Sequence, residues 1–333
     1  MLLMTPSSFL VITTLIASSL LALMSSNWLM AWIFMEINLL SFIPVITSQK
    51  SNQEVEAAIK YFLAQALGSA MMLFSSMSLW SINMSSSMWV AILILALLLK
   101  LGAAPCHFWF PSVMTSISWL SALLLTSWQK LAPLMLLCFP LTGSKTLSSM
   151  MTGVAALNAL IGGTLGLNQT HLRTLLGYSS ITHMGWMISA MSTNMPSLSL
   201  IYFMIYVLII APTFLLLHKI SLTRSTQMLS SIMTSKTLLL CVSLLLLSLA
   251  GLPPLTGFLP KWMIINTMMS CNQLVILLLL LGSYMNLYFY LNLVFNMMTT
   301  TMYSHVKKEI YIPMHNTMIM ISSSTLGMLP ILI

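Results

Sequence analysis

Charge is what this sequence has least of. Only 5% of its 333 residues are charged, whereas soluble domains carry about 25%. Aspartate is absent, so the formal net charge of +8 reflects missing acids rather than a basic cluster. This composition excludes an ordinary soluble domain and argues against nucleic acid as a partner.

Cysteine is also scarce, and its positions are isolated. Cys106, Cys138, Cys241 and Cys271 form no C-x-x-C pair. The sequence therefore encodes neither a disulfide framework nor an iron–sulfur or zinc motif. We expect this chain to bind no cofactor and no metal of its own.

Apolar residues make up 59% of the chain and fall in runs of about 20, the length that crosses a bilayer. The first run lacks the preceding lysine or arginine and the A-x-A site of a signal peptide, so we keep it as a helix of the mature protein. The pattern predicts an all-α polytopic membrane protein of about eleven transmembrane helices. They are expected at residues 3–22, 27–47, 58–80, 88–105, 119–139, 147–167, 172–191, 198–217, 237–272, 274–298 and 316–333.

The fourth and ninth of these helices contain helix breakers. The fourth ends in KLGAAPCHFWFP, residues 100–111, and the ninth contains SLAGLPPLTGFLPKW, residues 248–262. Glycine and proline open the backbone, which a membrane protein tolerates only where protein or water meets the freed groups. We therefore predict that both helices are interrupted at mid-depth.

The spacing of the breaks also predicts an internal repeat. Because they are five helices apart, the first ten helices divide into two five-helix units, and the odd number inverts the second unit. We expect one transmembrane domain over 1–333, composed of repeats at 1–140 and 146–300 and a C-terminal helix at 316–333.

The loop charges predict an orientation. Successive loops between the predicted helices lie on opposite sides of the membrane. This assignment places Lys145 alone on one side. The other loop cations then share the opposite side: Lys50, Lys60, Arg173, Lys219, Arg224, Lys236, Lys307 and Lys308. By the positive-inside rule the N-terminus faces the charge-rich compartment and the C-terminus faces the other. Lys60 stands beside Glu54 and Glu56 at a helix start, where we interpret it as an interfacial anchor.

Charged side chains within the predicted helices are the main functional candidates. Glu36, Lys100 and Lys130 lie in helix interiors, and Lys261 lies beside the second break. A lysine at the bilayer centre costs roughly 2.5–3.5 kcal/mol, and residues that carry this cost usually line a bundle interior or an ion path. Glu36 must find a cation or stay protonated, and Lys100 and Lys130 are the candidates. We predict that Glu36 approaches Lys100 directly or through one water. The alternative is a static ion pair that only pins the helices together.

Two histidines add candidates whose roles the sequence leaves open. His183 lies mid-helix among serine and threonine side chains, so it is either a core histidine bonded to a hydroxyl or a proton relay. His107 follows the first break, as a relay or as a polar end group.

Several segments together resemble a known family: WLMAWIFMEINLLSFIP, KYFLAQ, KLGAAPCHFWFP, TSWQKLAPL, GLNQTHLRTLLGYSSITHMGWM and LAGLPPLTGFLPKWMII. They resemble subunit 2 of the mitochondrial NADH:ubiquinone oxidoreductases, an antiporter-like family of the membrane arm of respiratory complex I. They occur in the family's order and cover most of the chain. Cys106 replaces the phenylalanine usual in relatives, which leaves every charged position in register.

The resemblance implies a subunit that takes part in proton translocation coupled to electron transfer from NADH to ubiquinone. In that family the residues that match Glu36, Lys100, Lys130 and Lys261 form the proton path. NAD, FMN, iron–sulfur clusters and ubiquinone belong to the whole complex, and the partners are other membrane-arm subunits, lipids, protons and ordered water. The resemblance also implies the mitochondrial inner membrane, where the loop charges predict the N-terminus in the matrix and the C-terminus in the intermembrane space. Two alternatives remain: a stand-alone cation/proton antiporter and a purely structural membrane scaffold.

Overall fold

The structure is a computed structural model that describes residues 6–49, 51–80, 87–141, 145–220, 236–269 and 272–303. All regular elements in these ranges are helices, and no strand occurs among them. The all-α class is therefore confirmed. The helix predicted at 316–333 lies outside the described residues.

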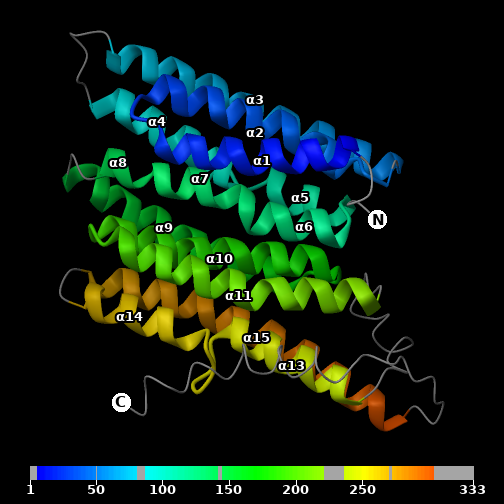
Figure 1. Cartoon of the computed structure of the whole chain (residues 1–333). Helices are drawn as coiled ribbons and strands as arrows, with labels where there is room; N and C mark the ends of the chain where they lie inside the picture. The colour runs from blue at the N-terminus through cyan, green and yellow to red at the C-terminus, as the bar shows by residue number, and fades with distance from the viewer. Residues whose placement is uncertain are drawn as a thin grey trace. The chain divides into compact units, whose positions relative to one another are not determined.

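The chain forms two compact units, and the first is Met1–Met150. Its long helices α1, α2 and α3 run side by side (Figure 1), and α3 also packs on α4 and α5. α7 packs on both α1 and α4, which brings the middle of the fifth predicted helix against the first break. The helices of this unit are α1 (Pro6–Met24), α2 (Trp28–Ile46), α3 (Asn52–Trp80), α4 (Ser87–Leu101), α5 (Trp109–Ser116), α6 (Trp119–Thr126), α7 (Trp128–Leu136) and α8 (Cys138–Leu141).

The predicted helix at 119–139 corresponds to one apolar segment long enough to cross a membrane, Trp119–Leu141, but this segment is not continuous. It divides into α6, α7 and α8, first at Ser127. There the hydroxyls of Thr126 and Ser127 both bond back to the carbonyl of Leu123, at 3.0 and 2.6 Å. Such back-bonding competes with the helix ladder and bends helices. Pro133, inside α7, removes a further backbone donor.

The second unit is Met151–Ile333. α10 contacts α11, α14 and α15, and nearly every residue along it is buried, so it forms the centre of this unit. α9 and α15 approach closely through small residues, because a side chain on Gly282 would collide with the backbone of Ala159. The helices are α9 (Lys145–Leu167), which begins just before this unit, α10 (Leu172–Ser192), α11 (Pro196–Ile220), α13 (Lys236–Ala250), α14 (Phe258–Met268) and α15 (Gln273–Tyr303).

Length and apolar composition identify the membrane-crossing elements. Within the described residues, seven helical segments are long and apolar enough to cross a bilayer: α1, α2, α3, the series α6–α8, α9, α11 and α15. Shorter apolar helices, Ser87–Leu101 and Leu240–Ala250, lead into the two breaks. The predicted inversion of one repeat relative to the other stays a prediction.

Candidate functional site

Both predicted interruptions are present, and both begin with the same backbone motif. α4 ends before Gly102, which has φ +66°, and α13 ends before Gly251, which has φ +82°. This left-handed conformation favours glycine, and it closes each helix as a Schellman motif. The closing bonds are Gly102 N–H to Leu99 O (3.1 Å), Ala103 N–H to Leu98 O (3.0 Å), Gly251 N–H to Ser248 O (3.0 Å) and Leu252 N–H to Leu247 O (3.4 Å).

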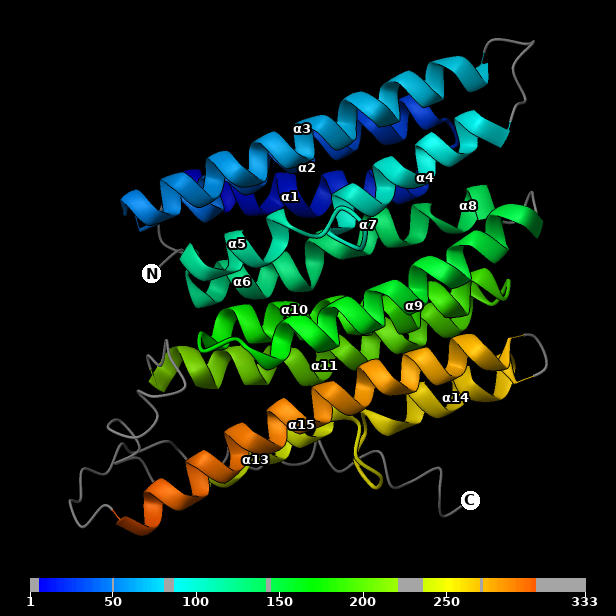
Figure 2. The same cartoon turned by 180° about the vertical axis from the view of Figure 1, so that it is seen from behind.

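The two interruptions also correspond in length. A proline stands three positions after each glycine, at Pro105 and Pro254. The next helix starts seven positions after the glycine, at Trp109 and Phe258. The loop between α13 and α14 is visible in yellow in Figure 1, and the loop after α4 leads to α5 in Figure 2. The two interruptions are thus alike in motif and in length, while the two-repeat organisation stays a prediction.

Side chains satisfy backbone carbonyls at both breaks. At the end of α4, Gln65 Nε2 donates to the carbonyl of Lys100 at 3.1 Å, and Trp109 Nε1 donates to the carbonyl of Leu99 at 3.0 Å. At the end of α13, Lys261 Nζ donates to the carbonyl of Ala250 at 2.7 Å. Carbonyls at a helix end lack helical partners, and leaving them unpaired in hydrocarbon is costly. These side chains therefore allow the breaks to exist inside a membrane.

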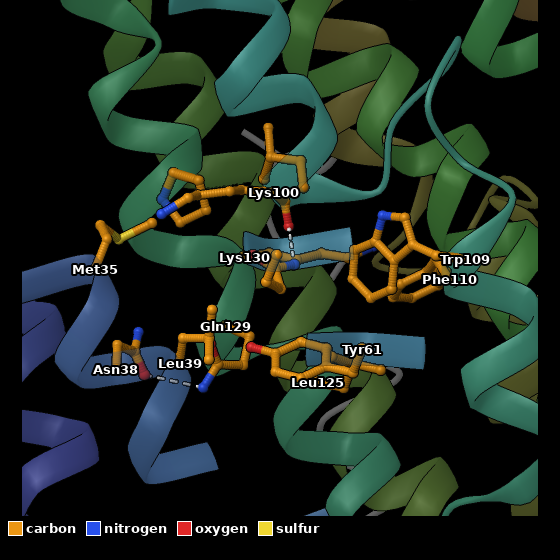
Figure 3. A pocket seen from close by; sticks show the side chains of 13 residues that line it. Met35, Asn38, Leu39, Tyr61, Lys100, Trp109, Phe110, Leu125, Gln129 and Lys130 are labelled. Carbon is orange, nitrogen blue, oxygen red and sulfur yellow. Dashed lines mark hydrogen bonds between the residues drawn. The ribbon is translucent and has the colours of Figure 1, made fainter. Parts of the chain in front are cut away.

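Lys100 and Lys130 line one cavity beside the first break (Figure 3). They are only 5% and 3% exposed. The cavity has a volume of about 10 Å³, close to the minimum that holds one water molecule. Tyr61 and Gln129 also line it, and Gln129 Nε2 donates to Asn38 Oδ1 at 3.0 Å. Two buried lysines and several amide side chains thus surround a space of about the size of one water molecule.

Lys130 is held over an aromatic ring. Its Nζ lies 4.3 Å from the centroid of Phe110, the second residue of α5. A cation within about 6 Å of a ring face is attracted by the ring's quadrupole.

Glu36 lies on α2 and is partly buried. Its carboxylate interacts electrostatically with Lys100 and with Tyr61, so it belongs to the surroundings of this cavity. In the described part of the chain, the only ion pair within 4.0 Å joins Lys60 to Glu56, at 2.6 Å. The direct contact between Glu36 and Lys100 is therefore not formed here, and an approach through water remains a prediction.

Lys261 lies in the second unit, 5% exposed, at the start of α14. Its ammonium packs over Gly251 and lines a groove of about 360 Å³ between α14 and α15. The rest of this groove is mostly apolar, with side chains such as Leu277 and Leu281. The lysine is therefore beside the break, as predicted.

The two histidines are buried in different surroundings. His183 Nδ1 and the Tyr202 hydroxyl are 2.8 Å apart, and the imidazole ring lies 5.0 Å from that of Tyr206. A cavity of about 10 Å³ beside His183 extends to Ser248 in α13. His107 lies within the first break, 3% exposed, with Nδ1 3.3 Å from the carbonyl of Pro105. Both positions are compatible with either role left open by the sequence.

Sequence reasoning missed the amide and aromatic side chains that complete the first site. Gln65 and Gln129 were not singled out, nor were Trp109 and Phe110. A usable signal was present for the amides: each is a polar residue inside an apolar helix, and Gln129 directly precedes Lys130. The ring contact of Phe110 had no comparable signal, because an aromatic residue in an apolar run is ordinary.

Potential metal ligands and cysteines are scattered among the residues that the structure describes. Within these ranges, no three His, Cys, Asp or Glu side chains are grouped closely enough to hold a metal ion. Cys106, Cys138 and Cys241 are free thiols there, and Cys271 lies outside the described ranges.

Comparison with known proteins gives consistent matches over most of the chain. Residues 25–286 match the family model described as NADH:quinone oxidoreductase/Mrp antiporter, TM. NADH-ubiquinone oxidoreductase chain 2 of Lumbricus terrestris is 48% identical over 294 residues, which cover 88% of this chain and 87% of the relative. The corresponding protein of Mammuthus primigenius is 38% identical over 345 residues, covering 97% of each chain.

Similarity to solved structures supports the same fold. A chain of respiratory complex I from Thermus thermophilus with bound Aureothin has a TM-score of 0.78 at 23% identity, covering 97% of this chain and 78% of that one. At such low identity the likeness concerns the fold alone. The family model and the relatives go further, and together they establish that the chain belongs to the NADH-ubiquinone oxidoreductase chain 2 family.

Proposed function

We propose that this chain takes part in proton translocation in the membrane arm of respiratory complex I, coupled to electron transfer from NADH to ubiquinone. Glu36, Lys100, Lys130 and Lys261 form its proton path, and His107 and His183 act as relays. The observation that carries this proposal is the cavity beside the first break, where two buried lysines meet a space for one water. Buried ionisable groups in membrane helices mark ion paths, because their insertion penalty is otherwise uncompensated.

Simple electrostatics indicates how such a group of charges could work. With an effective dielectric constant of about 20, opposite charges 4 Å apart attract by roughly 4 kcal/mol, and by half that at twice the distance. Separating Glu36 from Lys100 over that range therefore changes the interaction free energy by roughly 2 kcal/mol. Moving one proton against a potential of about 150 mV requires roughly 3.5 kcal/mol. Lys130 lines the same cavity, so repulsion between its charge and that of Lys100 adds to the free energy available for moving the proton.

The redox chemistry belongs to other subunits of the assembly. This chain contributes to an oxidoreductase complex, and the groups that react with NADH and ubiquinone are carried elsewhere. Its partners are neighbouring membrane-arm subunits, lipids, protons and ordered water. The chain spans the mitochondrial inner membrane several times, with its N-terminus in the matrix and its C-terminus in the intermembrane space, as the loop charges indicate.

The two alternatives make different predictions on purification in mild detergent and on mutation. A stand-alone antiporter would purify alone or as a homo-oligomer, whereas a complex I subunit purifies with a large redox assembly. A structural scaffold would lose assembly when a buried charge is removed. The family relationship favours the complex I subunit over both.

Lys100→Met tests the proposal, because it removes the charge and keeps most of the side-chain volume. We expect the complex to assemble and proton pumping into liposomes to fall at least several-fold per NADH oxidised. Lys60→Met is the matched control, since Lys60 is exposed and paired with Glu56, and it should pump normally. Wild-type pumping by Lys100→Met would contradict the proton-path role, and loss of assembly would favour the scaffold.

A further inference from the structure

Phe110 occupies an unusual place for a buried aromatic residue. It is 1% exposed and lines the cavity of Lys100 and Lys130. Its ring lies under the ammonium of Lys130, 4.3 Å from centroid to Nζ. Figure 3 shows Phe110 and Trp109 together at one end of this cavity, on the first turn of α5. The attraction between a cation and a ring is stronger at desolvated sites than at exposed ones, and both Phe110 and Lys130 are buried.

The helix break determines where this ring lies. A Cβ on Gly102 would fall 2.9 Å from Cβ of Phe110 and 3.1 Å from Cζ2 of Trp109, so only glycine lets α5 pack this closely on the end of α4. The indole of Trp109 is bonded to the carbonyl of Leu99, which fixes the first turn of α5 to α4. The ring of Phe110 is therefore tied to the geometry of the first break.

The elements around Lys130 carry few titratable side chains. Lys100 on α4 is a second cation, and Tyr61 on α3 is an uncharged phenol that lines the same cavity. Glu36 on α2 acts on Lys100 and Tyr61. His107 lies in the break between α4 and α5, and α8 carries Cys138. α1, α6 and the described part of α5 contribute no titratable side chain.

We propose that Phe110 is a positioning residue that stabilises the protonated form of Lys130 through its ring face and links that form to the first helix break. This inference rests on the proposed proton path and adds to it a group that no charge pattern indicates. A movement of α5 relative to α7 would withdraw the ring and destabilise the ammonium. A rearrangement of the first helix break would then also change the proton affinity of Lys130.

The test is the pH dependence of proton pumping by the assembled complex in liposomes. In Phe110→Leu the ring is lost, so Lys130 should lose its proton more readily. The alkaline limb of the pumping profile should move to lower pH by about one unit. Phe110→Tyr keeps the ring and should keep the wild-type profile. Phe42→Leu is the matched control: it removes a fully buried ring of the same unit that packs on Tyr61 rather than on a cation, and it should leave the profile unchanged.

Lys130→Met separates failure of this inference from failure of the proposed function. Normal pumping by Lys130→Met would overturn the proton-path role of Lys130. Impaired pumping by Lys130→Met together with an unshifted Phe110→Leu profile would overturn the role of Phe110 alone. An equal shift in Phe110→Tyr or Phe42→Leu would also overturn it, because packing rather than the ring face would then be responsible. If Phe110→Leu does not assemble, Phe110→Met, whose unbranched side chain adapts to irregular core space, is compared in the same way.

Discussion

The ammonium of Lys261 closes the second helix break by donating to the carbonyl of Ala250, the last residue of α13, at 2.7 Å. Because Lys261 belongs to α14, one hydrogen bond joins the two halves of the interrupted helix. The same contact satisfies a backbone acceptor that would otherwise be unpaired in hydrocarbon. The Lys261 ammonium therefore stabilises the break, and the carbonyl freed at the break in turn holds the ammonium.

Gly251→Ala should disturb this contact. A Cβ there would lie 2.6 Å from Nζ of Lys261, and φ +82° is unfavourable for alanine by roughly 1–2 kcal/mol. We expect lower thermal stability of the solubilised complex and reduced pumping. Gly153→Ala, where a Cβ meets no heavy atom within 4 Å, should be neutral or slightly stabilising. Equal behaviour of the two variants would contradict the contact.

Lys261→Met should impair pumping while the complex still assembles, because the site loses its charge but keeps its volume. The carbonyl of Ala250 also loses its donor, which should lower stability by about 1–3 kcal/mol. Pumping per NADH oxidised and the yield of intact complex are the measurements. Lys60→Met, at a side chain 46% exposed, is the control. Full pumping by Lys261→Met would remove this residue from the proton path.

Gln65→Leu tests the partner of the first break. It removes the amide that donates to the carbonyl of Lys100, and we expect a loss of about 1–3 kcal/mol because the carbonyl stays buried. Gln53→Leu changes an exposed glutamine of the same helix and should have little effect. Thermal unfolding of the solubilised complex compares them, and an equal melting temperature would show that the bond is unimportant.

Tyr202→Phe tests the relay role of His183. It removes the hydroxyl that bonds to Nδ1 and keeps the ring, so a relay should lose pumping several-fold while electron transfer to ubiquinone continues. Tyr288→Phe, on an exposed tyrosine of α15, should pump normally. A fall in thermal stability with unchanged pumping would instead assign His183 to the core.

The orientation can be checked at Lys219, an exposed residue near the end of α11. The loop charges predict that it faces the matrix. A membrane-impermeant amine reagent should therefore label Lys219 in inverted inner-membrane vesicles and not in mitoplasts, with mass spectrometry as the readout. Labelling in mitoplasts would reverse the orientation.

Much of this protein could be predicted from the sequence, because the relevant energies are local. A charge, a glycine or a proline inside an apolar run is costly in a membrane whatever it contacts. Lys100, Lys261 and the two breaks could therefore be recognised one segment at a time, and the all-α class followed from composition. Lys60, which we interpreted as an interfacial anchor beside acidic residues at a helix start, is exposed and paired with Glu56.

The contacts at the site depended on the tertiary structure. Gln65 reaches Lys100 from another helix, and Phe110 in α5 reaches Lys130 in α7 across two helix boundaries. The division of the fifth helix at Ser127 also arose from a balance that single-residue propensities do not resolve. Composition determined which groups must find partners in the membrane. Only the packing of helices distant in sequence decided which partners they found, because a partner is selected by distance and direction in space.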